Sequence, residues 1–150
     1  MKYVIQLIMA FIGSLGFAGI FNIKKELLFP ASLGGILSWA IYLITNIFSA
    51  NEILCYFVAS LSFTFYAEIM AIQKKTPVTL FIVPAAIPLI PGRALYSTMR
   101  YAVQGKSELS FQSGIYTFLL AGAISCGILC TMTIWPLFKK FIDSLCKSNN

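Results

Sequence analysis

The sequence predicts an all-α fold, a polytopic membrane helix bundle with four regular spans and one span that is broken by prolines. Hydrophobic residues make up 59% of the 150 residues and charged residues 11%, whereas a soluble domain carries about 25% charged residues. The apolar residues occur in runs of about 20, the length that an α-helix needs to cross the hydrocarbon core of a bilayer. Lysine pairs end three of these stretches, at 24–25, 74–75 and 139–140.

We expect a single integral membrane domain over residues 1–150. Its regular spans cover residues 3–21, 31–49, 53–72 and 113–138, and the broken span covers residues 78–104. The first run is too long for the hydrophobic region of a signal peptide, and no A-x-A-like cleavage site follows it, so we interpret it as a retained helix. The segment NIKKELLFP, residues 22–30, is expected to be a loop with a short turn at the membrane surface.

Positive residues predict the topology. If the broken segment crosses the membrane, one side holds seven of the eleven basic residues, namely Lys24, Lys25, Lys74, Lys75, Lys139, Lys140 and Lys147, and the other side holds four. Because cytoplasmic loops are enriched in Lys and Arg, the first and third loops are predicted to be cytoplasmic and the N-terminus to lie outside. If the segment is re-entrant instead, only the C-terminus changes side.

The composition argues against several other classes of protein. The net charge of +6 is spread over these loops, so a nucleic-acid partner is not expected. Cys126 and Cys130 share a helical face, but no acidic residue lies nearby and the chain has no histidine, so we expect no metal and no other cofactor. Without histidine, no serine or cysteine has a base beside it to activate it. We therefore do not expect an enzyme.

The segment IVPAAIPLIPG, residues 82–92, is apolar but poorly suited to an unbroken helix. Prolines 84, 88 and 91 each remove a helical hydrogen bond, which predicts free carbonyls at Leu80, Pro84 and Ile87. Such backbone persists at membrane depth only where it is buried in protein or lines a watery cavity. Transporters form binding sites from discontinuous helices of this kind, although a proline kink without a function is the alternative.

A second helix is expected to begin at Pro91-Gly92 and to carry one polar face. Arg93, Ser97, Arg100 and Gln104 follow each other at helical spacing, with Tyr96 beside them. Two arginines just after a break could bind an organic anion, or they could extend to lipid headgroups instead. The candidate substrate-binding residues are Pro84, Pro88, Pro91, Gly92, Arg93, Tyr96, Ser97 and Arg100.

Glu68 is an acidic residue inside the third predicted span, at a depth of roughly 7 to 9 Å from the Lys74-Lys75 end. An intramembrane carboxylate is typical of proton relays and of cation or substrate sites, so Glu68 is the candidate for proton or ion coupling. Extension of its side chain toward the lysines is the alternative.

Small residues also interrupt the spans and predict close helix packing. These are Gly13, Gly16, Gly19, Gly34, Gly35, Gly122 and Gly127.

Three segments together resemble the threonine/serine exporter family, specifically its small all-membrane subunit, which corresponds to the C-terminal half of the fused exporters. They are GFAGIFNIKKELLFPASLGGILSWAIY, YAEIMAIQKKTPV and VPAAIPLIPGRALYSTM. The last is the most specific, through Pro88, Leu89, Pro91, Gly92, Tyr96 and Met99. Asn22 and Glu68 also fit the family pattern, whereas Arg93 and Arg100 are not part of it.

The resemblance implies secondary export of small polar organic acids across the inner membrane. The expected substrates are threonine- or serine-like amino acids, or dicarboxylates such as succinate. It also implies a larger membrane subunit of the same family as partner, and a second copy of this chain is another candidate partner. A non-transporting assembly or stabilising subunit and a channel component remain the alternative functions.

Overall fold

The computed structural model describes residues 2–49 and 51–148, with side-chain positions for residues 3–49 and 51–137. Over these residues the chain forms helices and no strand, which confirms the predicted all-α class. The elements are α1 (Lys2–Ile20), α2 (Lys25–Phe48), α3 (Glu52–Lys74), α4 (Thr79–Ala86), the short 3₁₀ helix η1 (Ile87–Leu89), α5 (Gly92–Val103) and α6 (Ser107–Ser148).

Four helices are long and apolar enough to cross a membrane. They are Tyr3–Ile20, Lys25–Phe48, Glu52–Lys74 and Ser107–Leu137. A fifth segment is a bent pair, Thr79–Leu89 followed by Gly92–Val103, with 56° between its halves. This is the architecture of a multi-pass membrane protein with four regular spans and one broken segment, as the sequence predicts.

Three helices end at a residue whose backbone has the left-handed conformation. Asn22, Lys75 and Gly105 have φ values of 52°, 51° and 70°. After each of them, the next N–H bonds to a carbonyl five residues back, as in Ile23 N to Ala18 O at 3.1 Å and Lys106 N to Tyr101 O at 3.0 Å. This pattern satisfies carbonyls that the end of a helix leaves open. Asn22 therefore serves as the stop of α1, and the loops that follow these helices are short.

The predicted loop over residues 22–30 is wrong in its second half, because α2 begins at Lys25 and contains Pro30. A proline at this position removes only the hydrogen bond to the carbonyl of Glu26. Glu26 lies at an exposed turn, where water or lipid headgroups can hydrate that carbonyl. The helix can therefore include the proline, and the Tyr66 hydroxyl donates to the carbonyl of Pro30 at 2.8 Å.

Small residues hold the helices together. A Cβ built on Gly34 would lie 2.8 Å from Cβ of Ala85 in α4, and one built on Gly35 or Gly127 would lie closer still to the hydroxyl of Ser14 or Ser60. These three glycines confirm the prediction of close packing. The other glycines named above, at 13, 16, 19 and 122, meet nothing within 4 Å in this chain.

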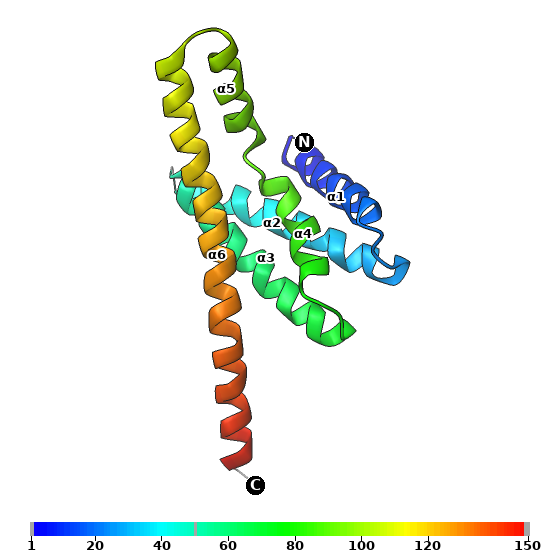
Figure 1. The fold of residues 1–150 in the computed structure, drawn as a ribbon. Helices are drawn as coiled ribbons and strands as arrows, with labels where there is room; N and C mark the ends of the chain where they lie inside the picture. Colours follow the sequence, from blue (N-terminus) through cyan, green and yellow to red (C-terminus); the bar gives the residue numbers. More distant parts are fainter. Residues whose placement is uncertain (1, 50, 149–150) are drawn as a thin grey trace.

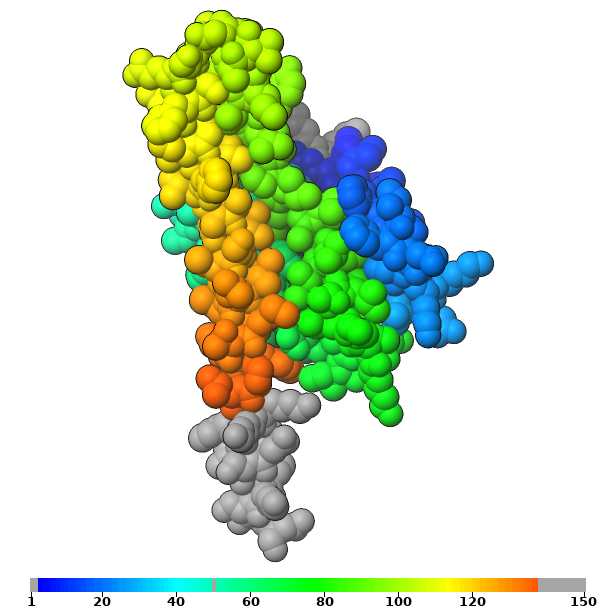
Figure 2. Space-filling model, in the orientation of Figure 1, coloured from blue at the N-terminus to red at the C-terminus, as the bar shows by residue number. Residues whose placement is uncertain are grey.

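α5 and the first part of α6 form an antiparallel hairpin that extends beyond the other helices (Figure 1). The Ser110 hydroxyl donates to the carbonyl of Thr98 at 3.0 Å across this hairpin. None of the residues of α5 is buried. Its apolar side chains Leu95, Met99 and Val103 are 54%, 65% and 90% exposed, and Figure 2 shows the hairpin as one free end of the molecule.

Candidate functional site

The proline-rich segment forms a bend with its own hydrogen bonds. η1 follows α4 directly, and the N–H of Ile90 donates to the carbonyl of Ile87 at 3.2 Å. The N–H of Gly92 donates to the carbonyl of Ile90 at 2.7 Å. With φ −75° and ψ 57° at Pro91, this is an inverse γ-turn, a geometry that the fixed φ of proline favours.

The expectation of a free carbonyl at Ile87 is therefore wrong. Pro91 does remove the helical donor, but the tighter 3₁₀ turn supplies the N–H of Ile90 in its place. What the break leaves open is the start of α5. The N–H groups of Arg93 and Ala94, in its first turn, have no acceptor among the described residues. Free donors of this kind can bind an anion at a helix N-terminus.

A cavity of about 470 Å³ lies beside this bend, and we call it the break cavity. Its lining comes from α3, α5, α6 and the residue before α5. The lining residues are Glu52, Tyr56, Pro91, Arg93, Ala94, Ser97, Gln112, Ser113, Tyr116 and Leu120. Five of its seven polar side chains, those of Glu52, Tyr56, Gln112, Ser113 and Tyr116, come from parts of the chain outside the broken segment. The cavity has the size and the few convergent polar groups that are typical of a small-molecule site.

The structure brings three of the eight predicted substrate-binding residues to this cavity, namely Pro91, Arg93 and Ser97. The other five lie outside its lining. Pro84 is buried in α4, where it packs in the core. Pro88 is half-buried in η1 and Gly92 is exposed.

The predicted polar face of α5 divides into two parts. Arg93 and Ser97, at its beginning, line the break cavity. Arg100 and Gln104, one to two turns further on, are exposed, and the ring of Tyr96 is 68% exposed. The helical spacing of these residues is therefore as predicted, but only the first turns of the face border the cavity, where Ser97 is half-buried and Arg93 is exposed.

Glu52 is a charged residue of the cavity that the sequence prediction missed. The Tyr42 hydroxyl donates to its Oε1 at 3.1 Å, and the Tyr116 hydroxyl donates to its Oε2. Within residues 3–49 and 51–137, no lysine or arginine nitrogen approaches this carboxylate within 4.0 Å. Glu52 is thus an anchored carboxylate without an ion-pair partner in the described part of the chain.

Comparison with known proteins identifies the family. A family model described as Threonine/Serine exporter, ThrE, matches residues 6–134 of the 150. The chain belongs to the threonine/serine exporter family. The match covers all the residues that line the break cavity, so this cavity is part of the exporter domain. Nothing among curated proteins or solved structures matches the chain.

Family membership assigns the chain to exporter-type transport, which confirms the resemblance seen in the sequence and the prediction of a membrane transporter.

In this exporter-family member, Glu68 lies on α3 well away from the break cavity. Sixteen residues separate it from Glu52 on the same helix, which corresponds to about 24 Å. Glu68 is partly exposed. The two carboxylates therefore occupy different depths of the exporter domain.

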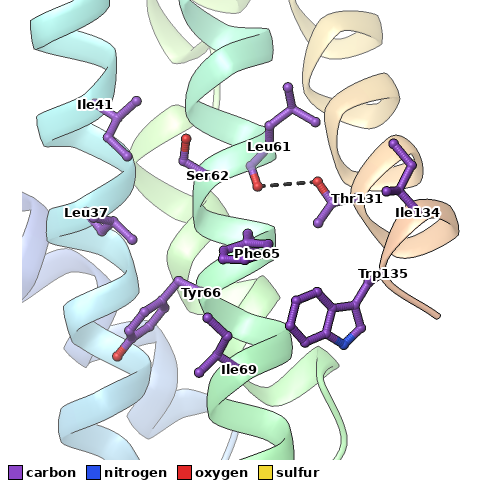
Figure 3. A pocket seen from close by; sticks show the side chains of 10 residues that line it. All are labelled: Leu37, Ile41, Leu61, Ser62, Phe65, Tyr66, Ile69, Thr131, Ile134 and Trp135. Carbon is purple, nitrogen blue, oxygen red and sulfur yellow. Dashed lines mark hydrogen bonds between the residues drawn. The ribbon is translucent and has the colours of Figure 1, made fainter. Parts of the chain in front are cut away.

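A second, larger cavity lies between α2, α3 and α6 (Figure 3). It measures about 690 Å³, and its lining is Leu37, Ile41, Leu61, Ser62, Phe65, Tyr66, Ile69, Thr131, Ile134 and Trp135. None of these residues is charged, and its hydroxyls are used within the protein. Ser62 donates to the carbonyl of Val58 at 2.9 Å, and Thr131 donates to that of Leu61 at 3.3 Å, as Figure 3 shows. A polar substrate would lose its hydration there without replacement, so the break cavity is the candidate site.

Proposed function

We propose that this chain is a subunit of a secondary exporter that moves small polar organic acids out across the inner membrane. The substrates in question are threonine- or serine-like amino acids, or dicarboxylates such as succinate. The observation that supports this proposal is the break cavity, where a discontinuous helix presents a guanidinium and free backbone donors at the wall of a polar cavity. Discontinuous helices hold substrate in this way in secondary transporters.

The carboxylate of the substrate binds at the start of α5. Arg93 supplies up to two parallel hydrogen bonds and a full positive charge. The N–H groups of Arg93 and Ala94 lie in the same first turn and have no acceptor in the described chain. Ser97 follows one turn later on the same wall and can donate or accept a hydrogen bond.

The prolines and Gly92 act through the backbone. Pro88 and Pro91 stop α4 from continuing into α5, and the γ-turn at Pro91 sets the direction in which α5 begins. Pro84 supports the bend from the core, where it is buried. Gly92 meets no neighbour within 4 Å, which leaves space at the first position of α5 for a substrate group.

Tyr96 and Arg100 contribute only where a partner subunit covers α5. Both side chains are exposed in this chain, and the apolar residues of the hairpin around them are exposed as well. We propose that the larger membrane subunit of the family packs against this hairpin. Rocking of one subunit against the other would then alternate access to the cavity.

We further propose that the broken segment crosses the membrane. A bend of 56° is well short of a reversal, and α5 in Figure 1 continues away from the loop between α3 and α4. The first loop, the third loop and the C-terminus then face the cytoplasm, because these three parts together hold seven of the eleven basic residues. Glu68 lies near that side, as a site where proton or ion binding drives export.

The test is to replace Pro88 and Pro91 with alanine together in the full chain, in its native host, and to measure efflux of labelled threonine and succinate from loaded cells. Without these prolines α4 could continue as a helix through residues 88–91, which would redirect the start of α5. Misplacement of a site by about 1 Å can cost on the order of 100-fold in rate. We expect at least a tenfold loss of efflux at an unchanged membrane level. Pro136→Ala is the matched control, since Pro136 lies inside α6 and outside the cavity.

Unchanged efflux in the Pro88 and Pro91 double variant, at normal membrane level, would contradict the proposal. The chain would then act as a non-transporting assembly or stabilising subunit whose break is a packing kink. Efflux that ignores the imposed proton gradient would identify a channel component in place of a secondary exporter.

A further inference from the structure

We propose that Glu52 is a specificity-determining residue of the break cavity. It binds the ammonium group of a zwitterionic substrate and disfavours a dicarboxylate. The inference rests on the function proposed above and selects between the two substrate classes that it leaves open.

The charges of the cavity suit a zwitterion. Glu52 and Arg93 are the two charged residues of its lining, and they come from different helices, α3 and α5. They make no ion pair with each other, because no nitrogen of Arg93 lies within 4.0 Å of the Glu52 carboxylate. Opposite charges that share a cavity and do not neutralise each other can bind a ligand that carries both charges. An amino acid with its carboxylate at Arg93 and its ammonium at Glu52 meets this requirement.

Two tyrosine hydroxyls orient the Glu52 carboxylate and leave it able to bind a cation. Each carboxylate oxygen accepts one hydrogen bond, from Tyr42 or from Tyr116, and each keeps a further lone pair. The two hydroxyls fix the carboxylate without cancelling its charge.

Aromatic rings around Glu52 add to the preference for a cation. Tyr56 lines the cavity, and its ring centroid lies 5.0 Å from that of Tyr42, which in turn stacks on Trp39 at 4.9 Å. The face of a tyrosine ring attracts an ammonium group and repels an anion. A dicarboxylate bound at Arg93 would bring its second negative charge into the same small cavity as Glu52, where like charges repel strongly.

The experiment measures uptake of labelled threonine into inside-out membrane vesicles that contain the whole exporter. Three unlabelled competitors are compared, which are threonine, succinate, and 2,3-dihydroxybutyrate, the threonine analogue with a hydroxyl in place of the ammonium. Loss of a hydrogen bond to a charged group weakens binding on the order of 10- to 100-fold. We expect the wild-type exporter to prefer threonine over both other competitors by this factor.

Glu52→Gln keeps the size of the side chain and removes its charge. This variant should weaken the apparent affinity for threonine on the order of 10- to 100-fold and leave that for 2,3-dihydroxybutyrate unchanged. Glu108→Gln is the matched control, because Glu108 is an exposed carboxylate in the first turn of α6, outside the cavity. Tyr116→Phe, which removes one of the two anchoring hydroxyls, should reduce the preference for threonine by a smaller factor.

Equal competition by threonine and 2,3-dihydroxybutyrate in the wild-type exporter would overturn the inference without any variant. Equal weakening of all three competitors by Glu52→Gln would overturn it too, since Glu52 would then be structural. Wild-type vesicles that accumulate succinate but not threonine would refute the inference and keep the proposed function. Vesicles that accumulate neither would refute the proposed function itself, and the inference with it.

Discussion

Gly34→Ala tests the packing that places the broken segment. A Cβ on residue 34 would lie 2.8 Å from Cβ of Ala85, whereas nonbonded carbons rest at about 3.5–4.0 Å. Ala85 is fully buried and has no flexible end that could move aside, so α2 and α4 must separate by roughly 0.7–1.2 Å. Overpacking of this kind costs about 1–3 kcal/mol. Alanine recovers about 1 kcal/mol of helix propensity, so we expect a net loss of up to about 2 kcal/mol.

The assay is thermal unfolding of the purified full chain in detergent. The net loss corresponds to a fall in the melting temperature of up to about 8 °C for a protein of this size. Gly122→Ala is the matched control, because Gly122 also lies inside a helix but meets nothing within 4 Å, so its melting temperature should stay the same or rise. A Gly34→Ala chain that melts at or above the temperature of Gly122→Ala would refute the packing argument.

Three further predictions concern the site, the coupling and the core. Arg93→Gln should raise the threonine concentration for half-maximal export on the order of 10- to 100-fold. Lys106→Gln, at an exposed position outside the cavity, should change it less than about twofold, and similar effects of both would argue against the cavity. Glu68→Gln should abolish the pH dependence of export, and an unaltered pH profile would remove Glu68 from the mechanism. Ser14→Ala should keep or raise the melting temperature, because Ser14 Oγ is buried without a hydrogen-bond partner in the described residues; a clear fall would show that this hydroxyl has a partner.

The number and class of the spans follow from hydropathy, because a span must be apolar along its whole length. The start of the second helix at Lys25 does not follow, since residues 22–30 were predicted to be a loop with a short turn. Whether a helix can include a proline depends on the surroundings of the carbonyl that it frees, and here that carbonyl belongs to the exposed Glu26.

In the broken segment, too, some features follow from the sequence and others do not. The prolines predict where the helix stops, and the helical spacing predicts that Arg93 and Ser97 share one face. The sequence does not reveal that the Ile87 carbonyl is satisfied by a 3₁₀ turn, nor that only the first part of that face borders a cavity with α3 and α6. Both depend on contacts between segments that are remote in the chain.

Glu52 lies in the short stretch between the predicted spans 31–49 and 53–72, where nothing in its sequence neighbourhood indicates a site. Its partners come from α2 and α6, and Tyr116 lies 64 residues away. No local pattern could therefore connect them. A usable signal was present, however, since tyrosines at 42, 56 and 116 and this glutamate are polar groups close to the ends of three spans on one predicted side.

The central claim is that substrate binds in the break cavity, and substrate protection of a thiol tests it most directly. Ser97→Cys, in a background without the four native cysteines, places a thiol in the cavity lining, and Gln104→Cys places one at the exposed end of the same polar face, outside the lining. The rate of labelling by a polar methanethiosulfonate reagent is measured in membranes with and without threonine. Threonine should slow labelling several-fold at residue 97 and leave the rate at residue 104 unchanged. Equal rates at residue 97 with and without saturating threonine or succinate would contradict the account.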